Sequence, residues 1–210
     1  MKIAVVGGGV IGLTTAFRLQ YEFMRNAEIT VFAESFDNIV SYTAAGIFRV
    51  GTSYCGASET NTSLNSILYF FNCNLIVNAP WIKMFCYGEL DTYVIPNLNG
   101  AVTLGGTRNF DCENMTICPY ESAAIFARCR KLIPSLANAQ LIRQEVGLRP
   151  HREGEKNKLQ IDCILTDTFL QIVDNYGHDG YGVSMAPGTA SEAIHTAIQL
   201  HTRSSFVSKL

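Results

Sequence analysis

The residues most able to take part in binding chemistry form a glycine-rich segment near the amino terminus. Residues 7–12 satisfy the pattern G-x-G-x-x-G at Gly7, Gly9 and Gly12, with Val10 and Ile11 before the last glycine. Glycines at this spacing allow a tight turn, a close approach of the backbone to a pyrophosphate, and close packing of a helix on a strand. The start of that helix also offers free N–H groups and a positive partial charge to an anion. The segment therefore indicates dinucleotide binding.

The elements around the glycines must be a strand, a helix and a second strand. Residues 2–6 are mostly apolar and predict a buried strand, and apolar residues recur at helical spacing over 10–21. A second strand is predicted over 28–33. Glu34 follows it, about twenty residues beyond the last glycine, where a carboxylate that binds ribose is expected. This combination favours a dinucleotide site but does not by itself distinguish FAD from NAD.

The carboxyl-terminal half shows signals for a hairpin and two helices. Strands are predicted over 91–95 and 101–104, joined by a polar turn that ends in Asn-Gly. A helix is predicted over 119–132, opened by a proline and stopped by Pro134. A final helix carries an apolar stripe formed by Ala190, Ala193, Ile194, Ala197 and Ile198.

Composition excludes several classes of protein. The chain is 48% hydrophobic and 16% charged, which is typical of a protein that folds around a core. A net charge of −2 leaves no basic surplus for nucleic acid. The apolar stretch 67–77 is too short to span a membrane and is interrupted by Asn72 and Asn74. The seven cysteines form no C-x-x-C pair, and the four histidines show no ligand spacing, so no metal site is expected.

Three further segments could contact a ligand: 104–108, 146–150 and 175–182. The third is glycine-rich and precedes a helix, so it could bring backbone N–H groups to a ligand, although a structural turn would explain it equally well. The last three residues, Ser208, Lys209 and Leu210, match the tripeptide read by the peroxisomal import receptor. We therefore expect the protein in the peroxisomal matrix.

Taken in order, these segments resemble the FAD-dependent D-amino-acid oxidase family. The resemblance implies an α/β protein, with a Rossmann-like FAD-binding domain and a truncated α+β substrate domain that contains a mixed or antiparallel sheet. We expect residues 1–58 and 141–210 in the first domain, 79–140 in the second, and 59–78 as a shortened connection, because the family has a much longer segment there. The matching stretches are 5–13, 44–47, 79–81, 103–106, 147–150 and 175–178.

The resemblance also implies a substrate site for acidic D-amino acids. Arg149 matches the arginine that binds the substrate α-carboxylate through its planar fork of donors. Tyr93 matches a tyrosine whose hydroxyl helps to hold the same group, and Arg108 is expected to meet the side-chain carboxylate. Gly180 is expected to line the site. The alternatives are a surface ion pair for Arg149, a solvated charge for Arg108 and a packed aromatic residue for Tyr93.

FAD is the cofactor that the resemblance implies, and the flavin, rather than a catalytic side chain, is expected to perform the chemistry. The reaction would convert a D-amino acid such as D-aspartate or D-glutamate, with dioxygen, to a 2-oxo acid, ammonia and hydrogen peroxide. Two alternatives stay open: an inactive shortened member that at most binds nucleotide, and an oxidase or dehydrogenase of other amines. The residues expected to contact FAD are Gly7, Gly9, Val10, Ile11, Gly12, Glu34, Ala45, Gly46, Gly177, Gly180, Tyr181 and Gly182.

Overall fold

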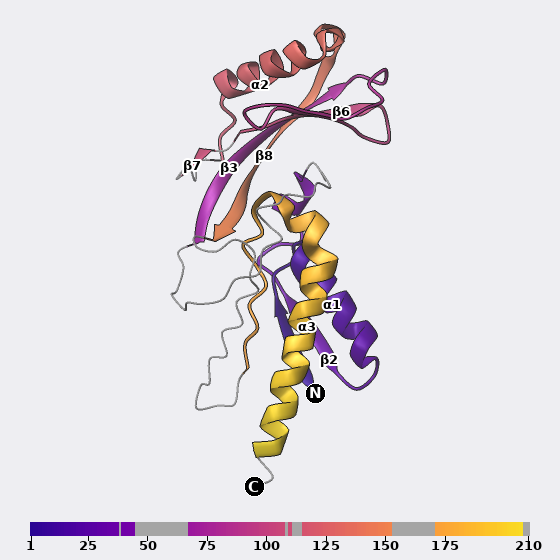
Figure 1. The fold of residues 1–210 in the computed structure, drawn as a ribbon, viewed down its shortest axis with the longest axis vertical. Helices are drawn as coiled ribbons and strands as arrows, with labels where there is room; N and C mark the ends of the chain where they lie inside the picture. The colour runs from indigo at the N-terminus through magenta and orange to yellow at the C-terminus, as the bar shows by residue number, and fades with distance from the viewer. Residues whose placement is uncertain (38, 45–66, 108, 111–114, 153–170, 208–210) are drawn as a thin grey trace. The chain divides into compact units, whose positions relative to one another are not determined.

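The computed structural model describes residues 1–37, 39–44, 67–107, 109–110, 115–152 and 171–207 (Figure 1). They form two compact units. The described residues of unit 1 come from Met1–Ser41 and Arg152–Leu210, and those of unit 2 come from Tyr42–Ile47 and Ser66–His151.

Unit 1 is built on a βαβ element. Strands β1 (Lys2–Val6) and β2 (Glu28–Phe32) pair in parallel from Lys2↔Glu28 to Val6↔Phe32, and helix α1 (Val10–Phe23) connects them. The predicted strand, helix and strand around the glycines are thus confirmed. Parallel neighbours need such a crossover, because a short hairpin turn can join only antiparallel strands.

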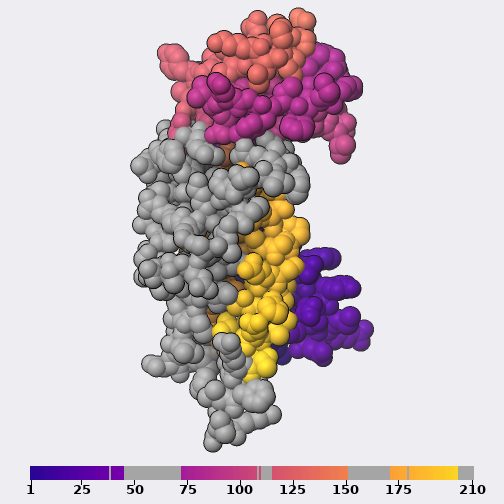
Figure 2. All heavy atoms as spheres, in the orientation of Figure 1, coloured from indigo at the N-terminus to yellow at the C-terminus, as the bar shows by residue number. Residues whose placement is uncertain are grey.

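Helix α3 (Gly182–Val207) packs beside α1 in the same unit (Figures 1 and 2). Their contact is centred on a small buried cluster of Val5, Leu19 and Ile194, one from each of β1, α1 and α3. The predicted apolar stripe accounts for this packing, because Ala190, Ala193 and Ile194 are all buried. The helix begins at Gly182 and contains Pro187 near its start.

Unit 2 is organised around a six-stranded sheet with β3 at its centre. In the order β4-β5-β6-β3-β7 each strand pairs antiparallel with its neighbour, and β8 also pairs with β3. The fold is therefore the expected combination of a parallel α/β element and a largely antiparallel sheet. The six strands are β3 (Ile67–Asn78), β4 (Cys86–Tyr87), β5 (Tyr93–Pro96), β6 (Ala101–Gly105), β7 (Asn109–Phe110) and β8 (Gln140–Arg152).

The predicted hairpin is confirmed as β5 and β6, which pair through Ile95↔Thr103 and Pro96↔Val102. The turn closes with a bond from the Asn97 N–H to the Ala101 carbonyl, 2.8 Å long. Gly100 has φ 75°, in the left-handed region that glycine adopts without strain.

Strands β6 and β7 pair with successive parts of β3, but one residue is inserted between them. Leu75 pairs with Leu104, whereas Phe71 pairs with Asn109, so five steps on one strand oppose four on the other. In this interval the Cys73 N–H donates to the Thr107 hydroxyl over 2.9 Å, a side-chain acceptor in place of a backbone carbonyl. The segment after Gly105 therefore leaves the regular ladder.

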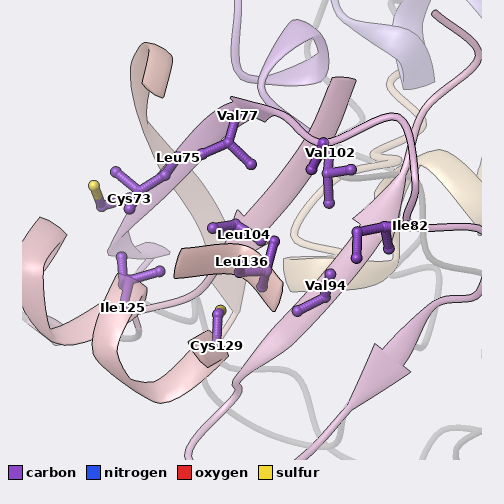
Figure 3. Close-up of a cluster of buried hydrophobic side chains, with 11 residues drawn as sticks. Cys73, Leu75, Val77, Ile82, Val94, Val102, Leu104, Ile125, Cys129 and Leu136 are labelled. Atoms are coloured by element: carbon purple, nitrogen blue, oxygen red, sulfur yellow. The ribbon is translucent and has the colours of Figure 1, made fainter. Parts of the chain in front are cut away.

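Helix α2 (Pro119–Leu132) has the predicted bounds and is followed by the short 3-10 helix η3 (Pro134–Asn138). Both pack on the sheet and bury its apolar side chains, which point toward one another in Figure 3. This cluster is the larger of the two cores. It comprises Cys73, Leu75, Val77, Ala79, Ile82, Val94, Val102, Leu104, Ile125, Cys129 and Leu136.

The compact units differ from the domain boundaries expected from the sequence. Residues 67–78, expected within a shortened connection, form the central strand of unit 2, in which Cys73, Leu75 and Val77 belong to the buried core. Residues 141–151, expected in the FAD-binding domain, belong to β8 and pair with β3. Among the described helices, none has the length and apolar character needed to cross a membrane.

Candidate functional site

The glycine loop of unit 1 has the geometry that its motif requires. Gly7 has φ 123°, a conformation rare for residues with a side chain. A Cβ atom on Gly12 would overlap the Gly7 carbonyl oxygen. Gly9 precedes α1 with φ −79°, and a Cβ atom there would meet only the Ser41 hydroxyl, at 3.3 Å. Gly7 and Gly12 are thus needed by the fold, whereas Gly9 keeps the loop backbone uncrowded.

The loop that follows β2 lies directly against the glycine loop. A Cβ atom on Gly8 would approach Ala33 Cβ and the Ser35 carbonyl oxygen, both to 2.9 Å. Glu34 stands between those two residues and is exposed. A carboxylate is therefore present beside the glycines, in the loop that follows the strand paired with β1.

The N-terminus of α1 has one N–H group already engaged. The Val10 N–H donates to the Ser41 hydroxyl over 2.9 Å. The first N–H groups of a helix have no acceptor within the helix, so the N–H groups of Ile11 and Gly12 can donate to a ligand. The motif did not predict a role for Gly8 or Ser41, since neither is one of the glycines of G-x-G-x-x-G.

The second glycine-rich segment leads into α3. Gly177 has φ 82°, and the Tyr181 N–H donates to the His178 carbonyl over 3.0 Å, within the 3-10 helix η4 (Asp179–Tyr181). Gly180 is exposed, Tyr181 is buried, and Gly182 is the first residue of α3. This segment therefore sets glycines at the start of a helix, as the sequence predicts.

Asn175 ties the second segment to α1 and leaves one polar atom unsatisfied. Its Nδ2 donates to the Thr15 hydroxyl over 3.4 Å, within unit 1. Its Oδ1 is buried without a hydrogen-bond partner. An orphaned acceptor, two helix starts and a carboxylate beside a glycine turn fit a dinucleotide such as FAD. Ala45 and Gly46, expected to contribute, lie outside the described residues.

Unit 2 contains a separate buried polar cluster. Tyr93, the first residue of β5, is 5% exposed, and its hydroxyl donates to Asn74 Oδ1 over 2.6 Å. Arg149 on β8 donates from Nη2 to Asn72 Oδ1. Both asparagines belong to β3, which brings together the two residues expected to hold a substrate carboxylate.

The environment of Tyr93 keeps its hydroxyl protonated. Burial raises the pKa of Tyr93, and the nearby positive charge of Arg149 offsets part of that increase. The hydroxyl is therefore a hydrogen-bond donor at neutral pH, which is the role that binding a carboxylate needs.

The double glycine after β6 makes room for the Tyr93 ring. A Cβ atom on Gly105 would overlap the ring and its hydroxyl, and one on Gly106 would lie 2.9 Å from Cε1. Arg128 on α2 braces this segment, donating from Nη2 to the Gly106 carbonyl over 2.8 Å and from Nε to the Thr92 hydroxyl over 3.0 Å. The ring of Tyr93 thus lies against a backbone segment that Arg128 holds in place.

The sequence did not predict Asn72, Asn74 or Arg128 as residues of the site. The two asparagines did give a signal, because they interrupt an apolar strand at alternate positions and so share one face. Arg128 gave none, since an arginine on an amphipathic helix is usually solvated. Arg108 lies outside the described residues, and Gly180 belongs to unit 1. In the described part of the chain, no group of three His, Cys, Asp or Glu side chains could hold a metal ion.

Comparison with known proteins defines the class to which this arrangement belongs. A family model described as "FAD dependent oxidoreductase" (DAO) matches residues 67–195, which is more than half of the chain. The chain belongs to this FAD-dependent oxidoreductase family, whose cofactor is FAD.

The chain is also similar to individual curated proteins. The chain is 42% identical over 121 residues to D-aspartate oxidase from Homo sapiens, which is 57% of this chain and 35% of that protein. It is 30% identical over 117 residues to D-amino acid oxidase from Dugesia ryukyuensis, covering 55% and 35% of the two chains. The chain thus spans about a third of the length of these curated relatives.

Solved structures support the fold. Glycine oxidase from Bacillus cereus ATCC 14579 superposes with a TM-score of 0.56 at 19% identity, over 66% of this chain and 37% of that one. Glycine oxidase from Geobacillus kaustophilus gives 0.53 at 18% identity, over 60% and 34%. At these identities the likeness concerns the fold alone.

Proposed function

We propose that this protein is an FAD-dependent oxidase of D-amino acids that prefers the acidic ones, D-aspartate and D-glutamate. The observation that carries the proposal is the 42% identity to human D-aspartate oxidase, together with a family match that includes both Tyr93 and Arg149. The hydrogen bonds that link these two residues to neighbouring positions of β3 support a shared binding role.

In this proposal the side chains of unit 2 bind and orient the substrate. Arg149 offers a planar fork of donors to the α-carboxylate, and the Tyr93 hydroxyl donates to the same group. Arg108 binds the carboxylate of the substrate side chain and so provides the preference for acidic substrates.

In unit 1 the glycine loop and the start of α1 hold the pyrophosphate, and Glu34 binds the ribose. Ala45, Gly46 and the segment 177–182 complete the contacts to the cofactor. When bound, FAD supplies the acceptor for the hydride from the substrate α-carbon, and dioxygen accepts the electrons to give hydrogen peroxide. The imino acid that oxidation of the substrate produces then hydrolyses to a 2-oxo acid and ammonia.

The first test is the visible absorbance of the purified 210-residue chain, with and without added FAD. Under anaerobic conditions, D-aspartate should bleach the flavin and L-aspartate should not. Arg149→Gln should abolish bleaching, whereas Arg143→Gln, on the same strand and paired with Glu145 over 2.7 Å, should leave it intact. Bleaching by both enantiomers would contradict the proposal.

Substrate preference is tested with Arg108→Ala. Loss of the distal charge partner should lower kcat/KM for D-aspartate by roughly a hundredfold, as expected for one charge-assisted hydrogen-bonded pair, and leave D-alanine nearly unchanged. An equal effect on every substrate, or none on any, would favour an oxidase or dehydrogenase of other amines.

A second candidate is a family member that binds nucleotide at most and turns nothing over. The observation that favours it is the length of the chain, which spans about a third of the relatives that it matches. Flavin that binds but is not reduced by any D-amino acid would select this candidate.

We also propose that the protein is imported into peroxisomes through Ser208, Lys209 and Leu210, which lie outside the described residues. Release of hydrogen peroxide gives that location a chemical rationale. A fluorescent protein fused in front of the chain should become punctate in cells, and deletion of Leu210 should leave it diffuse. Diffuse fluorescence of both fusions would contradict import by this signal.

A further inference from the structure

Strand β3 carries two buried amide side chains where an apolar strand would be expected to carry none. Asn72 is 5% exposed and Asn74 is fully buried. Along the strand they alternate with the apolar residues Cys73 and Leu75. Alternate residues of a strand point to the same face, so both amides project to one side of the sheet. Buried amides lower stability unless their hydrogen bonds are satisfied, so their partners need to be identified.

In the hydrogen bonds of the two amides, both Oδ1 atoms accept and both Nδ2 atoms donate. Arg149 donates to Asn72 Oδ1, and Asn72 Nδ2 donates to Asn74 Oδ1 over 3.3 Å. The Tyr93 hydroxyl donates to the same Asn74 oxygen, while Asn74 Nδ2 donates to the Thr43 carbonyl over 2.8 Å. Each amide oxygen therefore faces a donor from another strand, and this set of bonds fixes the orientation of both amides.

We propose that Asn72 and Asn74 form an internal acceptor pair that competes with a carboxylate ligand for Arg149 and Tyr93. The two Oδ1 atoms offer these donors two hydrogen-bond acceptors, as the two oxygens of a carboxylate would. This inference rests on the proposed function, in which the same arginine and tyrosine bind the substrate. Asn72 is the member that a ligand displaces, because its arginine is only half-buried, whereas Asn74 is held by the Thr43 carbonyl.

The balance of the competition follows from charge. A guanidinium is attracted to the full negative charge of a carboxylate and can donate to both of its oxygens, whereas a neutral amide offers one oxygen and no net charge, so a carboxylate ligand replaces the amide. Displacement leaves the Asn72 oxygen buried without a donor, which weakens net binding. Removing the Asn72 amide therefore tightens binding, the opposite of what loss of a positioning contact would do.

The experiment measures binding of succinate, which has two carboxylates and no amino group to be oxidised, to the full FAD-loaded chain by calorimetry. Asn72→Ala should lower Kd about tenfold, equivalent to about 1.4 kcal/mol. Asn72→Asp should raise Kd by a similar factor or more, because its carboxylate pairs with Arg149. Asn78→Ala, an exposed asparagine on the same strand, is the control and should leave Kd unchanged.

Unchanged or weaker succinate binding by Asn72→Ala overturns the inference. Urea unfolding verifies that each variant is folded, and Asn72→Asp decides the matter alone if Asn72→Ala does not fold, since unchanged binding by it also overturns the inference. If Arg149→Gln abolishes succinate binding while the Asn72 variants change nothing, the inference fails and the proposed carboxylate site stands. If succinate and its diamide bind equally, or if Arg149→Gln has no effect, the carboxylate site and this inference both fail.

Discussion

Tyr93 is held in place by contacts from β3, from α2 and from the segment that ends β6. Its hydroxyl donates to Asn74, its carbonyl lies 3.5 Å from the Cys129 thiol, and its ring rests on the Gly105–Gly106 backbone. Arg128 secures that backbone from α2. A side chain restrained on all these sides has little freedom to adapt, so its neighbours tolerate little change in volume.

The first prediction at the residue scale concerns Gly105. Gly105→Ala should destabilise the protein by about 2–3 kcal/mol, because the new methyl group would overlap the Tyr93 ring and overpack a filled core. Urea unfolding measures the loss. The control is Gly88→Ala, whose added Cβ would meet only a movable Leu132 methyl group at 3.3 Å and should cost less than about 1 kcal/mol. Equal losses would show that the Tyr93 contact is not the cause.

The second prediction concerns the buried thiol of Cys129. Burial raises the pKa of this thiol from 9.0 to about 11. Between pH 9 and 11 the unfolded thiol therefore loses its proton while the folded one keeps it, so the free energy of unfolding falls as pH rises through this range. In Cys129→Ala that fall should be smaller by on the order of 1–2 kcal/mol. Urea unfolding at several pH values, under reducing conditions, measures the slope, and parallel curves for the two proteins would contradict the prediction.

At the scale of elements, local signals were enough to predict much of the fold. The turn ending in Gly100 and the prolines that flank α2 act on neighbouring residues, so the hairpin and this helix could be predicted without tertiary information. The role of β3 could not be predicted in that way. Its pairing with β6, β7 and β8 joins segments far apart in the chain, and an apolar run alone does not identify its partners.

In the candidate site too, residues with a local backbone requirement could be predicted, and residues that depend on distant contacts could not. Gly7 and Gly12 were predictable because their requirement is local backbone geometry, which φ 123° at Gly7 confirms. Asn72 and Asn74 were visible only as polar interruptions, because their function depends on donors from two other strands. Arg128 contacts Thr92 and Gly106 through the packing of α2 on the sheet, which no sequence spacing encodes.

Helix α3 provides the prediction at this scale. Pro187 lies inside the helix, where it removes an N–H that would bond to the Val183 carbonyl. Pro187→Ala should stabilise unit 1 by about 1–2 kcal/mol, the restored helix bond outweighing the added entropy of the unfolded chain. The comparison is Pro119→Ala at the first position of α2, where the missing N–H has no helical partner, and little or no gain is expected. Thermal unfolding monitored by circular dichroism distinguishes the two, and equal shifts would refute the explanation.

For the whole molecule, the two units differ in how completely they bury apolar surface. Among the described residues, unit 2 has a core of eleven buried residues that pack with α2, whereas the buried cluster of unit 1 contains Val5, Leu19 and Ile194. Unit 1 also leaves large apolar side chains in solvent, with Phe17 and Tyr21 each 71% exposed and Val6 84% exposed.

This exposure predicts that the protein associates with itself as concentration rises. Phe17 and Tyr21 are one helical turn apart on α1 and form an apolar strip that water contacts unfavourably. The double variant Phe17→Glu with Tyr21→Glu should weaken association by about tenfold or more, because two aromatic contacts are lost and charge is added. Sedimentation velocity over a concentration series measures the effect. Arg18→Glu, on the same helix, changes the net charge by the same −2 and should weaken association much less, so an equal effect would assign the association to charge rather than to the apolar strip.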